Sequence, residues 1–118
     1  MTTFRFDLPI PPSTNGAYYN VPGRGRVATK ANKEWKAEAG WMIKLAHPGR
    51  IEGKFRFTIL LPENMRGDVD NRVKLALDVL GPKGCGVTPD DRHAVSAKPE
   101  RSAEVPSGRC IVIVESVA

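Results

Sequence analysis

The apolar residues of this chain recur with the two-residue period of strands in some segments and with the three- to four-residue period of helices in others. The order of these segments along the chain is compatible with few folds. Four segments show the alternation of a half-buried strand: residues 3–8, 54–61, 93–98 and 110–114. Two others, residues 30–46 and 71–80, carry apolar residues at three- and four-residue steps, which predicts helices. Two helices and about four strands predict an α+β domain, with both helices packed on a mixed four-stranded sheet.

Capping and breaking residues mark the ends of the two helices. Thr29 is available as the N-cap of the first helix, and Asp70 sits where the N-cap of the second belongs. Gly81, followed by a proline, is expected to end the second helix. Trp35 and Trp41 both fall within the first helix, and we expect both to serve packing rather than base stacking.

A long irregular segment, residues 9–28, separates the first strand from the first helix and contains four prolines and three glycines. Loops of this length in a compact domain are usually functional or mobile. Its basic and tyrosine side chains suit phosphate contacts and stacking on unpaired bases. The candidate DNA-binding residues are Asn15, Tyr18, Tyr19, Arg24, Arg26, Lys30 and Lys33. For the lysines, a solvated helix face is the alternative explanation.

Length and composition narrow the functional classes. At 118 residues we expect one domain, residues 1–118, because two cores would not fit. A net charge of +5 favours an anionic partner such as nucleic acid. Cys85 and Cys110 lack the spacing of a disulfide framework or a zinc site, so both are expected to be reduced thiols. Without a long apolar run or a secretory signal, the protein is expected to be cytoplasmic, with no membrane partner.

The stretch GDVDNRVK, residues 67–74, carries the strongest chemical signal. Asp68 and Asp70 lie two residues apart, so in extended backbone their carboxylates point the same way and repel unless a cation lies between them. Carboxylate oxygens suit Mg²⁺ or Mn²⁺. Lys74 would reach a metal and phosphate held there and offset charge in the transition state. The alternatives are a capping Asp70, a solvated Asp68, and an ion pair of Lys74 with Asp70 or Asp78.

A second acidic pair, Asp90 and Asp91, follows a Thr-Pro turn. If the strand over residues 93–98 pairs beside the end of the strand over residues 54–61, Asp91 arrives at the mouth of the second helix and completes a cup of three carboxylates. The alternative is an exposed turn, because Pro-Asp-Asp is ordinary turn chemistry. His93, at a strand start, is interpreted as a surface residue and not as part of the site.

Three stretches share an order that is typical of one family: LPIPPSTNGAYYN with its GRGR tail, then GDVDNRVKLALDVLG, then DDRHAV. In this order and at similar separations, over nearly the whole chain, they resemble the RusA family of Holliday-junction resolvases, which are crossover junction endodeoxyribonucleases. The most specific part is the Asp-x-Asp-Asn-x-x-Lys arrangement followed by the acidic pair.

The resemblance implies a catalytic site and its requirements. The residues that it assigns to this site are Asp68, Asp70, Lys74 and Asp91, with Asn71 and Asp90 in support. The three aspartates Asp68, Asp70 and Asp91 would be the metal ligands, and Lys74 the catalytic lysine. The family also implies a homodimer, dependence on Mg²⁺ with Mn²⁺ able to substitute, no organic cofactor, and frequent carriage on prophages.

The expected function is hydrolysis of DNA phosphodiesters by paired symmetric nicks, which would resolve four-way junctions in recombination and repair. Two other classes stay open. A non-catalytic, structure-selective DNA-binding module would use the aspartates only as caps, would bind junctions equally well in EDTA and Mg²⁺, and would never nick them. A metal-dependent transferase would use the aspartate pair for a nucleotide diphosphate, although 118 residues leave little room for a donor pocket.

Overall fold

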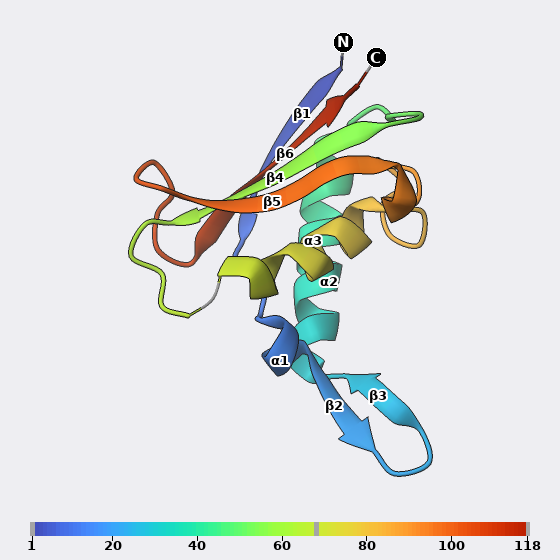
Figure 1. Ribbon diagram of the computed structural model, residues 1–118, viewed down its shortest axis with the longest axis vertical. Coiled ribbons are helices and arrows are strands. Elements are labelled where there is room, and N and C mark those ends of the chain that lie inside the picture. Colours follow the sequence, from blue (N-terminus) through green and yellow to red (C-terminus); the bar gives the residue numbers. More distant parts are fainter. Residues whose placement is uncertain (1, 68, 118) are drawn as a thin grey trace.

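A mixed sheet of four strands carries the two long helices on one face (Figure 1). The strands are β1 (Thr3–Pro9), β4 (Phe55–Pro62), β5 (Ala94–Ser102) and β6 (Arg109–Ser116), in the order β1-β6-β4-β5. β4 and β5 run parallel, and the other neighbours are antiparallel. This computed structural model describes residues 2–67 and 69–117. The predicted α+β class, with helices on a mixed four-stranded sheet, is confirmed.

The helices form close to where the sequence predicts them. α2 (Lys30–Leu45) begins after Thr29, whose hydroxyl oxygen accepts the backbone N–H of Asn32 at 3.3 Å, so the predicted N-cap is confirmed. The second helical segment has two parts, a 3-10 turn η1 (Val69–Arg72) and the helix α3 (Val73–Leu80).

The core lies between the helices and one face of the sheet. Alternate residues of β4, namely Phe55, Phe57, Ile59 and Leu61, are fully buried against the apolar faces of α2 and α3. Burial of each such side chain stabilises the fold by about 1.5–3 kcal/mol. The indole N–H of Trp35 donates to the Pro9 carbonyl at 2.8 Å and so ties α2 to the end of β1.

The segment over residues 9–28 is more ordered than the predicted long loop. It contains a short helix α1 (Thr14–Ala17) and a hairpin of β2 (Tyr18–Val21) and β3 (Gly25–Ala28), which projects away from the sheet (Figure 1). Gly23 and Gly25, with φ of 80° and 74°, adopt the left-handed conformation that the turn requires.

A tight connector closes the end of α3 and leads the chain toward the second acidic pair. The backbone N–H groups of Val87 and Thr88 donate to the carbonyl of Leu80, and that of Cys85 donates to the carbonyl of Val79 at 2.8 Å. These bonds satisfy carbonyls that a helix end leaves unpaired. The connector then reaches the 3-10 turn η2 (Asp91–His93), from which β5 starts.

Two predictions about the helices are wrong. Asp70 is not a helix N-cap, because it lies inside η1; Arg72 holds the cap position of α3, with no side-chain cap bond. Trp41 is not packed in the core, since its relative exposure is 65%, against 5% for Trp35. The residues of α2 that face the core follow Trp35 at four-residue steps, and Trp41 falls off that stripe.

Cys85 and Cys110 are both free thiols, as predicted. Among the residues described, no helix is both long enough and apolar enough to cross a membrane.

Candidate active site

Arg101 of β5 fixes the loop that leads into the acidic motif. The guanidinium of Arg101 donates to three backbone carbonyls of the loop between β4 and η1: Glu63 at 3.3 Å, Met65 at 2.6 Å and Gly67 at 3.2 Å. A fork of donors that spans three carbonyls fixes the path of a loop more firmly than single bonds would. The sequence pattern alone gave no reason to single out Arg101.

A second arginine anchors the start of the helical segment. Arg72, the last residue of η1, donates from Nη1 to the carbonyl of Pro11 at 2.5 Å. This bond joins η1 to the chain that leads into α1 and the hairpin, so the candidate catalytic helix and the basic hairpin are attached to each other. Asn71, which the resemblance places in support of the site, lies half-buried in the same turn.

Asp70, Lys74 and Asp78 follow one another at four-residue steps along the segment of η1 and α3, so they lie on about the same face, with roughly 6 Å of rise between successive members. Asp70 and Lys74 are exposed, and Asp78 is half-buried. Asp78 forms an ion pair with Lys36 of α2, whose Nζ lies 3.7 Å from Oδ2. Within the described part of the chain no ion pair involves Lys74, so neither pair expected as its alternative role is observed.

Asp91 meets this face from η2. Although the residue is exposed, partial burial raises the pKa of its carboxyl above the ordinary 3.8. Asp78 also raises this pKa, Lys74 lowers it, and Asp90 adds a smaller rise. Asp91 and Asp90 line the same groove as Asp78 and Val79, so the second acidic segment lies beside α3. Asp90 itself caps η2, because its Oδ1 accepts the backbone N–H of Arg92 at 3.0 Å.

The predicted route of Asp91 to the helix is wrong in one respect. β5 pairs with β4 in parallel, and Ala94 lies opposite Phe55, at the start of β4 and not at its end. Asp91 therefore approaches α3 on the side of Lys74 and Asp78, and Asp70 is not among the charges that shift its pKa. The physical reason is the long connector after α3, which returns the chain to the beginning of β4 before β5 starts.

The carboxylate oxygens of the site are ligands that a hard divalent cation prefers, but the described residues do not form a complete metal site. Among residues 2–67 and 69–117, no three His, Cys, Asp or Glu side chains lie close enough to hold a metal together. Asp68, one of the three predicted ligands, lies outside the described residues. Burial raises the pKa of Asp91 most, and the repulsion from Asp78 and Asp90 that adds to this rise is what a bound cation would relieve.

The predicted DNA-binding residues fall on α1, the hairpin and the first turn of α2. All except the half-buried Tyr18 are exposed: Asn15, Tyr19, Arg24, Arg26, Lys30 and Lys33. The guanidinium of Arg26 lies over the ring of Tyr18, 4.4 Å from its centroid, and this cation–π contact holds the arginine at the hairpin. Lys30 lies on the exposed face of α2, where its ammonium pairs with Glu34 at 3.6 Å.

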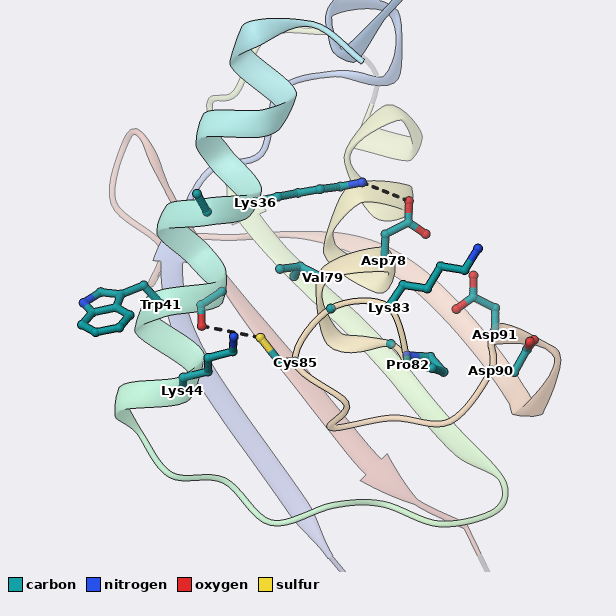
Figure 2. Close-up of a pocket in the computed structure, with 14 residues that line it drawn as sticks. Lys36, Trp41, Lys44, Asp78, Val79, Pro82, Lys83, Cys85, Asp90 and Asp91 are labelled. Atoms are coloured by element: carbon teal, nitrogen blue, oxygen red, sulfur yellow. Dashed lines mark hydrogen bonds and ion pairs between the residues drawn. The ribbon is translucent and has the colours of Figure 1, made fainter. Parts of the chain in front are cut away.

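A groove opens beside the acidic side chains, between α2 and the connector that follows α3 (Figure 2). Its volume is about 740 Å³, and Asp78, Asp90 and Asp91 line one side while Trp41 lines the other. Sequence reasoning missed this groove, because its walls come from segments that are distant along the chain.

No known protein-family model and no curated protein sequence matches this chain.

Proposed function

We propose that this protein is a divalent-metal-dependent endodeoxyribonuclease that resolves four-way DNA junctions as a homodimer. The observation that carries the proposal is the meeting of Asp91 with the Lys74 face of α3, since it joins the two segments on which the resemblance to RusA resolvases rests. The basic hairpin attached to the same helical segment supports a nucleic acid substrate.

Each residue would have a distinct role. The resemblance assigns Mg²⁺, or Mn²⁺ in its place, to Asp68, Asp70 and Asp91, and since Asp70 and Asp91 belong to no three-ligand cluster among the described residues, the ion would have to draw them together. When bound, such an ion lowers the pKa of a water and polarises a phosphodiester. Lys74, exposed and without an ion pair in the described structure, would place its ammonium against the negative charge that develops on the phosphate. Arg24 and Arg26 would hold the DNA backbone.

The test is a nicking assay on a synthetic four-way junction and a matched linear duplex, with Mg²⁺ and with EDTA. We expect paired nicks in the junction alone, and in Mg²⁺ alone. Asp70→Asn should lower the nicking rate more than about 100-fold, because it removes a ligand, yet preserve or tighten junction binding, because it removes a negative charge near phosphate.

The matched control is Asp7→Asn, the same change on β1 at the opposite edge of the sheet. Asp7 pairs with Arg109 at 3.1 Å in an exposed position, where an ion pair contributes at most about 1 kcal/mol, so this variant should nick normally. Full activity of Asp70→Asn would end the catalytic assignment. A wild-type protein that binds junctions equally in EDTA and Mg²⁺ and never nicks them would instead be a structure-selective DNA-binding module.

A further inference from the structure

The groove beside Asp91 has a wall that the proposed chemistry does not use. α2 supplies Trp41 and Lys44 to this wall, whereas Lys83, from the connector after α3, lies on the Asp91 side (Figure 2). Asp91 lies at the other side, so the groove runs from the candidate catalytic residues outward to the exposed indole of Trp41. A ligand that reacts at Asp91 and extends into the groove would therefore reach Trp41.

Trp41 lies at the α2 edge of the groove, with its indole pointing away from the acidic side chains (Figure 2). Its relative exposure of 65% exceeds that of Leu45 or Tyr19. A flat aromatic ring in this position offers its face to another planar group. Nucleobases stack on such rings whatever their sequence, since every base has a π-face. Bases in a continuous duplex are already stacked on each other, so a strand must be unpaired or distorted to use the ring.

The basic side chains of the groove, Lys44 on α2 and Lys83 on the connector, suit contacts with a phosphate backbone that runs along it (Figure 2). Lys44 and Lys83 have no ion pair among the described residues, so their ammonium groups are available to an anion. Lys36 pairs with Asp78 and so offsets the carboxylate nearest the middle of the groove. Asp90 and Asp91 form no ion pair among the described residues and lie at the other side of the groove, where Lys83 extends beside Asp91 and the metal is proposed to bind (Figure 2).

We propose that this groove binds the unpaired nucleotides next to the scissile phosphate, with Trp41 stacked on a base and Lys44 and Lys83 contacting the flanking phosphates. This inference rests on the proposed function, because Asp91 is what connects the groove to cleavage. It adds a reason for junction selectivity: strands at a crossover can leave the stack and enter the groove, whereas those of a linear duplex cannot.

A second copy of the chain is the competing occupant of this surface. Lysine is depleted in protein–protein interfaces, and here three lysines, Lys36, Lys44 and Lys83, line the groove together with a single tryptophan. Trp41 is also isolated from the buried clusters of the core. The composition of the groove therefore favours a nucleic acid strand over a protein partner.

The experiment measures binding of a short oligodeoxythymidine without cleavage, in EDTA. Trp35 is buried, so quenching of the intrinsic fluorescence reports on Trp41. We expect saturable quenching by the oligonucleotide and much weaker quenching by a blunt duplex of the same length. By anisotropy of a labelled oligonucleotide, Trp41→Ala should weaken binding at least about 5-fold, and Trp41→Phe should restore part of the affinity.

The control variant is Leu45→Ala, one turn further along α2. Leu45 is also exposed, at 58%, but it does not line the groove, so its removal should leave binding unchanged. Absence of quenching, or equal affinity of wild type and Trp41→Ala, would overturn the inference even if junctions are nicked. Quenching by the oligonucleotide without nicking in Mg²⁺ would support the groove and refute the nuclease. If Trp41→Ala converts a dimer to a monomer in light scattering, the surface belongs to a second copy and the inference falls.

Discussion

Arg101 shows how much of the candidate site depends on a residue outside it. Its guanidinium spans three carbonyls of the loop that leads to Asp70, so it acts as a positioning residue. The bonds are exposed, and their loss should affect global stability little while leaving the loop free to shift.

We expect Arg101→Ala to lower the junction-nicking rate by about 10- to 100-fold, because small displacements of catalytic groups are costly. Trypsin should also cut faster after Arg66, which lies exposed in the same loop. Arg101→Lys should recover part of the activity, and Lys98→Ala on the same strand should have no effect. Unchanged proteolysis at Arg66 would show that Arg101 does not order the loop.

Asp91 is the residue of the site from which we predict a pH dependence of folding stability. Partial burial, Asp78 and Asp90 raise its pKa above 3.8, and Lys74 opposes the rise. The folded protein thus binds this proton more tightly than the unfolded chain does, so stability falls as the pH rises from 3.8 through the folded pKa, and the full penalty is present at pH 7.

Asp91→Asn should therefore raise the melting temperature at pH 7 in EDTA by up to a few degrees, and the difference from wild type should shrink below pH 3.8. The effect is small because the side chain is largely exposed to solvent. Thermal melts across this range test it. Mg²⁺ should stabilise the wild type more than the variant. A lower melting temperature for Asp91→Asn at pH 7 would contradict the unfavourable burial and repulsion of the Asp91 carboxylate.

At the scale of elements, the proposed function assigns contact with the phosphate backbone to the hairpin of β2 and β3. It stands apart from the sheet (Figure 1), carries Arg24 and Arg26, and is joined to η1 through the bond from Arg72 to Pro11. An arm in this position can contact DNA on the side of Asp70 while the groove takes a strand on the side of Asp91.

The double variant Arg24→Ala/Arg26→Ala should weaken junction binding and reduce the slope of log affinity against log salt concentration by about 2, because each arginine would neutralise one phosphate. Binding titrations at several salt concentrations measure this slope. Arg5→Ala/Arg56→Ala removes the same charge from the sheet face opposite the helices and should change the slope less. Equal slopes for the two double variants would mean that DNA binding depends only on the net charge of the protein and not on the position of Arg24 and Arg26.

The whole molecule must supply two sites if paired nicks are to follow from symmetry. Light scattering should then give twice the chain mass of 12.9 kDa. Mixed dimers of wild type and Asp70→Asn should nick one strand of a junction and leave the opposite strand intact. Denaturing gels with each strand labelled separately resolve the two nicks. Paired nicking by purified mixed dimers would place both cuts in one subunit and contradict the symmetric scheme.

Local patterns in the sequence predicted the four strands of the sheet and the two main helices, with most of their limits, but not α1 or the hairpin of β2 and β3. The spacing of apolar residues predicted four strands and two helices, and Thr29 was recognised as a cap because its bond to Asn32 lies within one turn. The α+β class followed, since such elements have few ways to bury their apolar faces together. These properties depend on residues that are neighbours along the chain.

Only the tertiary structure decided which side chains from distant segments of the chain became neighbours. The parallel pairing of β5 with the start of β4 brought Asp91 to Lys74 and Asp78, and the packing of α2 turned Trp41 outward. Arg101 became important only because β5 runs next to the loop before η1. Strand pairing and helix rotation depend on contacts between distant segments, whose energies are shared over the whole core, so no local spacing of residues encodes them.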